Sequence, residues 1–104
     1  DVDWSLGYLP EEPPNVLYHG TVDKNIENIK KFGLLPQKRH AVHLSPNLET
    51  AIKVGRRRGD PIVLTIQSGK MYEDGYEFVV SKNGVWLTKI VPIEYIVFPS
   101  PPVR

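Results

Sequence analysis

The sequence predicts one α+β domain with a mostly antiparallel, split β-sheet and two short helices. The first half alternates strand, helix, strand and helix, whereas the second half contains four strand-like segments separated by turn signals. A chain of 104 residues is long enough for one modest core and too short for a second. It contains no internal repeat and no low-complexity segment.

The first strand and helix are predicted within residues 16–33. An apolar strand covers 16–19, and Asp23 follows as a helix N-cap. The helix runs over 23–32, and Gly33 suits the left-handed conformation of a C-terminal cap. Apolar residues recur there at helical spacing and are expected to face inward: Ile26, Ile29 and Phe32.

The second strand and helix follow the same order. A strand over 41–44 stops at Ser45-Pro46, where Ser45 suits an N-cap and Pro46 the first helical position. The helix should end near the arginine run 56–58, which is bracketed by Gly55 and Gly59. Its inward residues are expected to be Leu48, Ala51 and Ile52.

The second half is predicted to be all strand. The four segments are Ile62 to Gln67, Tyr76 to Val80, Val85 to Thr88 and Glu94 to Val97. Turn signals separate them at Ser68-Gly69, Asp74-Gly75 and Asn83-Gly84. Asn83-Gly84 is the strongest hairpin signal because both residues tolerate positive φ.

Residues 1–14 are predicted to be an extended linker that joins residues 15–104 to something upstream. Pro10, Pro13 and Pro14 disfavour a packed element there. The chain begins at Asp1 and carries no signal-peptide pattern, which indicates a fragment or a trimmed chain.

Composition narrows the function classes. The absence of Cys excludes a disulfide framework, a thiolate metal site and a Cys nucleophile, and no other metal site is expected. The apolar runs are far shorter than the ~20 residues that span a bilayer, so no membrane partner is expected. A net charge of +1 does not indicate nucleic-acid binding, but the clusters 38–40 and 56–58 indicate a local anion site.

Two runs each place a histidine at the end of a strand-like segment. Leu17 to Thr21 contains His19, and Arg39 to Ser45 contains His43. Polar groups at strand ends tend to line a cleft, and Gly20 lets a flat group approach the main chain closely. The pattern indicates a nucleotide or NAD pocket.

The chain resembles the C-terminal lobe of the NAD-dependent RNA 2′-phosphotransferases, distant members of the ADP-ribosyltransferase fold. The resemblance covers nearly the whole chain in family order. Its runs are 17–21, Gly33-Leu34, Arg39 with 42–45, Val54-Gly55 with Arg57 and Gly59, and 81–88. It implies an ADP-ribosyltransferase-like lobe that takes NAD as co-substrate and needs no metal.

The resemblance also implies roles for residues of the first run and for Ser45. His19 would bind the ribose hydroxyls of NAD, and the Gly20 main chain would hold the nicotinamide amide. Thr21 would either contact the ligand or only cap the first helix. Ser45 would either bind the nicotinamide amide or serve as the N-cap of the second helix.

His43 and Val85 match two further signature positions of the fold. His43 stands where relatives often have a Tyr that packs on nicotinamide. Val85 stands where many have a Glu that activates a neutral hydroxyl, and an apolar residue suits a phosphate nucleophile, which is already ionised. On pattern alone Val85 is a core position beside a hairpin.

The resemblance assigns catalysis to Arg39, which would contact the RNA 2′-phosphate and the phosphates of the intermediate. A guanidinium matches phosphate oxygens and stabilises developing charge. Arg57 would support the NAD pyrophosphate or the local loop, whereas Arg58 departs from the His expected there. Trp86 and Trp4 could stack on a base, although a Trp in a strand is more often core.

The implied reaction removes an internal 2′-phosphate from RNA, as in the last step of tRNA splicing in the cytoplasm. The phosphate attacks the nicotinamide-bearing ribose carbon of NAD and expels nicotinamide. The ribose 2″-hydroxyl then attacks phosphorus, giving RNA with a free 2′-hydroxyl and ADP-ribose 1″,2″-cyclic phosphate. The family also has an N-terminal winged-helix-like lobe that supplies an Arg-His pair and a further arginine. This chain alone is therefore expected to bind NAD weakly without completing the reaction.

Two other function classes fit parts of the sequence. A stand-alone ADP-ribosyltransferase acting on nucleic-acid phosphate ends or on protein would leave ADP-ribose attached to its acceptor. A non-catalytic RNA-binding module would show steep salt dependence and no response to NAD. The near-neutral charge disfavours the second class.

Overall fold

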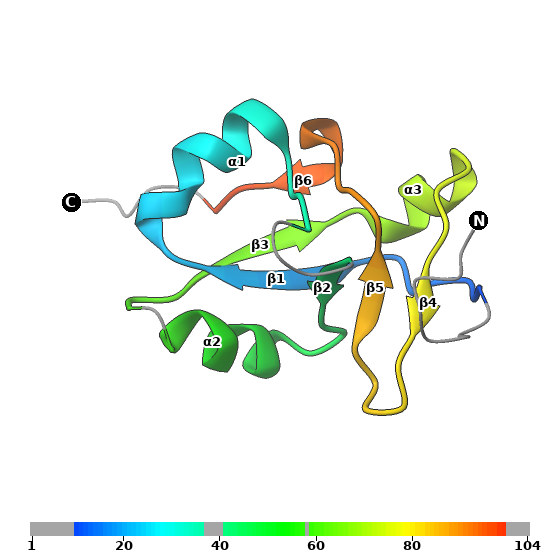
Figure 1. Ribbon diagram of the computed structural model, residues 1–104, viewed down its shortest axis with the longest axis horizontal. Coiled ribbons are helices and arrows are strands. Elements are labelled where there is room, and N and C mark those ends of the chain that lie inside the picture. The colour runs from blue at the N-terminus through cyan, green and yellow to red at the C-terminus, as the bar shows by residue number, and fades with distance from the viewer. Residues whose placement is uncertain (1–9, 37–40, 58, 100–104) are drawn as a thin grey trace.

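The strands form two antiparallel three-stranded sheets (Figure 1). The structure is a computed structural model that describes residues 10–36, 41–57 and 59–99. In the first sheet β3 (Ile62–Ile66) lies between β1 (Leu17–Thr21) and β6 (Ile96–Val97). In the second sheet β5 (Trp86–Thr88) lies between β2 (Val42–Leu44) and β4 (Val79–Val80). The predicted α+β class and split antiparallel sheet are confirmed.

The described ranges contain three short α-helices, one more than predicted. They are α1 (Ile26–Phe32), α2 (Leu48–Arg56) and α3 (Ser68–Glu73), with 3-10 turns η1 (Asp23–Asn25) and η2 (Ile93–Tyr95). The prediction of a turn at Ser68-Gly69 was wrong, because these residues begin α3. The predicted strand 76–80 shortens accordingly to β4. A helix of six residues, less than two turns, shows too little periodicity to be recognised from the sequence.

Several helix boundaries and inward faces differ from the predictions. Asp23 begins η1 and Val22 is the N-cap, whereas Asn47, not Ser45, is the N-cap of α2. Phe32, the last residue of α1, is 61% exposed, and Leu48, the first residue of α2, is 49% exposed. The predicted C-cap is confirmed, since Gly33 ends α1 with φ of +74°.

The hairpin predicted at Asn83-Gly84 connects β4 to β5. Val79 pairs with Leu87 and Val80 with Trp86. The Gly84 N–H donates to the Ser81 carbonyl at 2.9 Å, and Gly84 has φ of +81°. A glycine in the left-handed region is what this turn geometry requires.

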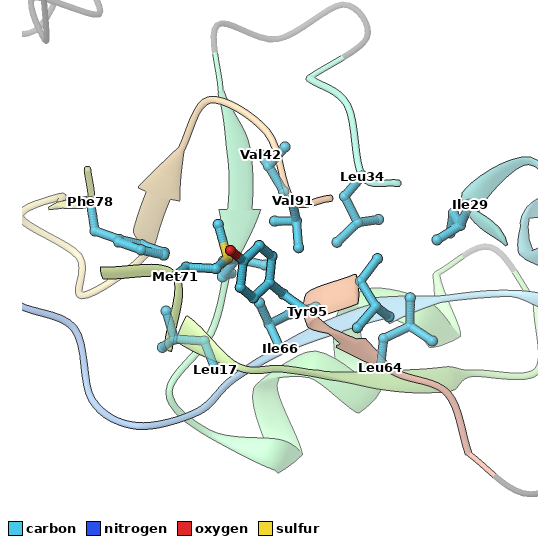
Figure 2. Packing of buried hydrophobic residues seen from close by; sticks show 12 residues of the cluster. Leu17, Ile29, Leu34, Val42, Leu64, Ile66, Met71, Phe78, Val91 and Tyr95 are labelled. Carbon is cyan, nitrogen blue, oxygen red and sulfur yellow. The ribbon is translucent and has the colours of Figure 1, made fainter. Parts of the chain in front are cut away.

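The main core lies between the two sheets and is closed by α1 and α3. Figure 2 shows Leu64 and Ile66 of β3 pointing toward Leu34, Val42 and Val91.

The buried Tyr95 forms a hydrogen bond at the edge of this core, in which its hydroxyl donates to Asp74 Oδ2 at 2.6 Å. This hydrogen bond raises the pKa of Tyr95 to about 12, and burial and the negative charge of Asp74 add to the effect.

The described part of the predicted linker, residues 10–14, is extended and lies against the folded lobe. Pro10 bridges to Val79, and the Glu11 N–H donates to the Phe78 carbonyl at 2.8 Å. The buried Ser68 hydroxyl donates to the Pro14 carbonyl at 2.7 Å. These contacts cover the edge of β4, which would otherwise expose unpaired main-chain groups.

Among the described residues, main-chain hydrogen bonds join β1 to β2 at one pair of residues. Tyr18 of β1 and Ser45, directly after β2, form an isolated antiparallel bridge with both N–H···O distances at 2.8 Å. Beyond this bridge β1 continues along β3 and β2 continues along β5. The split in the sheet therefore opens directly after Tyr18, at His19.

Candidate functional site

Four of the predicted site residues gather where the two sheets meet. His19 follows Tyr18 on β1, and Ser45 is the bridge partner of Tyr18. His43 lies on β2 and pairs with Leu87. Ser45 and Val85 each lie one residue beyond the last pair of the β2–β5 ladder, Leu44 with Trp86, at the same end. Residues separated by up to 66 positions in sequence (85 − 19) are thus brought to one junction.

Both histidine rings are half-buried and hydrogen-bonded to main-chain carbonyls. His19 Nδ1 lies 3.1 Å from the His43 carbonyl oxygen, across the split. His43 Nδ1 lies 3.1 Å from the Ala41 carbonyl oxygen, two residues back along the same strand. The ring of His19 is therefore held by β2 as well as by its own strand.

Gly20 is constrained on its side-chain face. A Cβ on Gly20 would lie 1.8 Å from the Ala51 carbonyl oxygen and 2.9 Å from the Gly55 nitrogen, so α2 fills that space. Helix packing therefore occupies the space that the missing side chain leaves on this face of β1.

The Gly20 main chain points elsewhere. Peptide groups alternate along a strand, so the N–H and C=O of Gly20 point to the same edge of β1 as those of Tyr18. That is the edge at which β2 has separated. Main-chain contact with a ligand stays a prediction for Gly20.

Thr21 is buried at the end of β1. Its Oγ1 accepts a hydrogen bond from Asn25 Nδ2 at 3.1 Å. It does not cap the first helix, whose N-cap is Asn25, nor η1, whose N-cap is Val22. The capping alternative for Thr21 was therefore wrong.

Arg57 is exposed and forms the C-cap of α2, as the arginine run predicted. The same helix end packs on β1, since a Cβ on Gly55 would lie 2.9 Å from the Thr21 carbonyl oxygen. A helix C-terminus favours a cation whether or not a ligand is bound. The proposed contact of Arg57 with the NAD pyrophosphate stays a prediction.

The Ser45 hydroxyl shapes the approach to α2. It accepts from the Asn47 N–H and lies 3.0 Å from the Asn47 carbonyl oxygen, to which it donates. This side-chain turn precedes the N-cap, so the predicted N-cap role was wrong by two residues. Contact with nicotinamide would require the hydroxyl to exchange one of these partners.

Val85 is half-buried against Ala41, Val79 and Leu87. Its N–H donates to Ser81 Oγ at 3.2 Å, which ties it to the base of the hairpin. Trp86 packs against the main core, in agreement with the structural alternative for that residue. Val85 thus provides an apolar wall next to Ser45 on the neighbouring strand.

The predictions for Arg39, Arg58 and Trp4 lie outside the described residues. Within the described ranges no three His, Asp or Glu side chains come close enough together to ligate a metal ion. In the same ranges no helix has the length and hydropathy that crossing a membrane requires.

Sequence reasoning missed the main-chain carbonyls of Ala41 and His43, which hold the two rings. It also missed Asn25, which holds Thr21. Main-chain groups carry no sequence signal of their own. Only the alignment of β1 against β2 could have revealed these main-chain contacts. That alignment depends on where the two strands separate, which the sequence does not indicate.

Comparison with known proteins gives one family. The family model described as "RNA 2'-phosphotransferase, Tpt1 / KptA family" matches residues 2–90. A probable RNA 2′-phosphotransferase of Burkholderia pseudomallei is 53% identical over 99 residues, covering 95% of this chain and 54% of the relative. Its counterpart in Flavobacterium johnsoniae is 56% identical over 95 residues, covering 91% and 52%. The chain spans about half the length of these relatives, and it belongs to the RNA 2′-phosphotransferase family.

Proposed function

We propose that this chain is the NAD-binding half of an enzyme that removes an internal 2′-phosphate from RNA. The 2′-phosphate oxygen attacks the nicotinamide-bearing carbon of NAD, and the bond to nicotinamide breaks. The 2″-hydroxyl then attacks phosphorus and loses its proton, while the RNA 2′-oxygen leaves and takes up a proton. The products are nicotinamide, ADP-ribose 1″,2″-cyclic phosphate and RNA with a free 2′-hydroxyl.

The observation that carries the proposal is the convergence of His19, His43, Ser45 and Val85 at the β1–β2 junction. These residues come from three strands and from the runs that carry the family resemblance. Polar side chains gathered where two strands separate are typical of a site for a ligand that bears hydroxyls and an amide.

The residues at the junction fit the parts of NAD that react. The His19 imidazole suits the ribose hydroxyls, and the His43 ring suits packing on nicotinamide. The edge-directed Gly20 peptide suits the planar carboxamide of nicotinamide. Val85 places an apolar surface where a carboxylate would repel an incoming phosphate. A phosphate is ionised at neutral pH, so the nucleophile needs no general base.

Partners of the chain follow from the same proposal. The acceptor is 2′-phosphorylated RNA, of which spliced tRNA is one form. The remaining half of the protein, corresponding to the winged-helix-like lobe, would complete the phosphate site. The chain alone is expected to bind NAD or ADP-ribose weakly and to leave 2′-phosphorylated RNA unchanged.

The testing experiment titrates the isotope-labelled chain with NAD and with ADP-ribose and follows the amide resonances. Shifts clustered at Gly20, His43 and Ser45 support the proposal, provided that His19→Ala weakens them and Glu73→Ala, an exposed change on α3, does not. No shift at millimolar ligand contradicts NAD binding by this half.

Product analysis on a protein that contains both halves then identifies the reaction. Release of a cyclic phosphate of ADP-ribose supports phosphate removal. ADP-ribose that stays attached to the RNA contradicts it and indicates an ADP-ribosyltransferase. Turnover by the isolated chain at the rate of the two-lobed protein would contradict the division of labour between the halves.

A further inference from the structure

The antiparallel pairing of β1 with β2 ends at Tyr18 and Ser45, and the next hydrogen-bonded pair of residues is not formed. In an antiparallel ladder such pairs recur every two residues, so Tyr18 with Ser45 would be followed by Gly20 with His43. In that pair the Gly20 N–H would donate to the His43 carbonyl. Between these two described strands only the Tyr18–Ser45 bridge is formed, and the His43 carbonyl lies instead 3.1 Å from His19 Nδ1.

We propose that the His19 ring takes the place of the Gly20 N–H in this ladder and thereby holds β1 and β2 apart. When a strand separates from its neighbour, a partly buried main-chain carbonyl at that edge still needs a hydrogen-bond donor. His19 supplies one from its side chain, so the strands can separate without leaving the His43 oxygen unsatisfied. The Gly20 peptide then remains directed into the separation.

The same contact determines which ring nitrogen carries the proton. A carbonyl oxygen only accepts hydrogen bonds, so the nitrogen that faces it at 3.1 Å must be the donor. His19 is therefore protonated on Nδ1, and in the neutral ring Nε2 is the acceptor. His43 follows the same rule, because its Nδ1 faces the Ala41 carbonyl.

The β2 main chain is thus a positioning element for both imidazoles. Two carbonyls fix two tautomers, and in each neutral ring the acceptor nitrogen is Nε2. The ligand part of this inference rests on the proposed function, whereas the tautomers and the strand separation do not. The contact from His43 to the His19 ring on which this inference rests is made by the His43 main-chain carbonyl.

The first test is the tautomeric state of the three histidines in the free, isotope-labelled chain. Long-range proton–nitrogen correlation spectra above the titration range of imidazole distinguish Nδ1–H from Nε2–H. His40→Gln assigns the third ring. We expect Nδ1–H for His19 and His43, and His43→Ala should leave His19 unchanged. Nε2–H at His19, or a switch to it in a folded His43→Ala chain, would overturn the inference.

The second test uses a pair of His19 variants. His19→Asn keeps a donor near the Nδ1 position, whereas His19→Ala removes it. We expect Gly20 amide hydrogen exchange in His19→Ala to slow roughly tenfold as Gly20 pairs with the His43 carbonyl, and to stay as in the parent chain in His19→Asn. Unchanged exchange in a folded His19→Ala chain would contradict the strand-separating role.

Ligand binding separates this inference from the proposed function. His19→Asn lacks the Nε2 acceptor, so its affinity for NAD should fall roughly tenfold while Gly20 exchange stays unchanged. If the parent chain binds no NAD, the proposed function fails, while the tautomers and the exchange rates still decide the inference. A His19→Asn chain that binds NAD as tightly as the parent would overturn the acceptor role of Nε2.

Discussion

Among the described glycines, Gly20 is the one at which an added Cβ would make the closest contact, so Gly20→Ala should destabilise the fold strongly. The new Cβ would lie 1.8 Å from the Ala51 carbonyl oxygen, whereas real Cβ contacts are essentially never under 3.0 Å. Strand or helix must therefore move apart by at least 1.2 Å (3.0 − 1.8), and both are main chain, so no side chain can rotate away. Ala51 is 1% exposed, which means that the movement also disturbs buried packing.

The expected cost is the upper end of that for overpacking, about 3 kcal/mol. In a domain of this size that corresponds to a fall in melting temperature of roughly 12–24 °C. Urea denaturation followed by tryptophan fluorescence and thermal denaturation followed by circular dichroism measure the two quantities. A fall of this size would leave a marginally stable chain partly unfolded near 37 °C.

Gly55→Ala is the matched comparison at the same helix–strand contact. Its Cβ would meet the Thr21 carbonyl oxygen at 2.9 Å and Pro61 Cβ at 3.0 Å, so movements of a few tenths of an ångström suffice. Alanine also gains about 1 kcal/mol of helix propensity over glycine. The net change should lie within about 1 kcal/mol of zero. Gly20→Ala costing no more than Gly55→Ala would refute this description of the contact.

Three further predictions concern the rest of the fold. Ser68→Ala removes the hydroxyl that donates to the Pro14 carbonyl and should lower the free energy of unfolding by about 1 kcal/mol in urea titrations; no loss would mean that residues 10–14 do not stabilise the lobe. Gly84→Ala places a side chain at φ of +81° and should cost about 1–2 kcal/mol, which an unchanged urea midpoint would exclude. The raised pKa of Tyr95 gives stabilisation that is complete below pH 10 and is lost between pH 10 and about 12, where the unfolded chain loses its phenol proton first. Urea denaturation at pH 9 and at pH 11 should show that the free energy of unfolding falls between these pH values in the parent chain and falls less in Tyr95→Phe. Equal falls in the two chains would rule out Tyr95 as the cause.

The sequence allowed the order of elements to be predicted where a local rule determined the structure. The turn at Asn83-Gly84 and the C-cap at Gly33 depend on positive φ, which only a few residues tolerate, and both were confirmed. Ser45 was misplaced as an N-cap because Ser45 and Asn47 are both good capping residues, two positions apart. Local chemistry could not choose between them, whereas the Tyr18 bridge places Ser45 outside the helix.

The helix α3 and the outward positions of Phe32 and Leu48 could not be predicted for a different reason. A helix of one or two turns has no second repeat with which to test a period of 3.6 residues. Whether its terminal apolar residue faces the core depends on how the helix packs against the rest of the fold, which the local sequence does not determine. The candidate site was predictable as a set of residue types, but the contact between the His19 ring and the β2 carbonyl required the relative placement of two sheets.

Gly20 explains why the candidate site uses main-chain groups at the point where β1 and β2 separate. Its side-chain direction is closed by the Ala51 carbonyl, so no residue larger than glycine fits without moving α2. Its N–H and C=O point into the separation that His19 maintains through the His43 carbonyl. Glycine there can offer a ligand only a peptide group, and that group has a fixed direction because β1 is held by β3 on its other edge. A peptide N–H and C=O on one strand edge form a donor and acceptor pair that is complementary to a planar carboxamide. The proposed NAD site therefore depends on the exclusion of a side chain at Gly20 as much as on the two imidazoles.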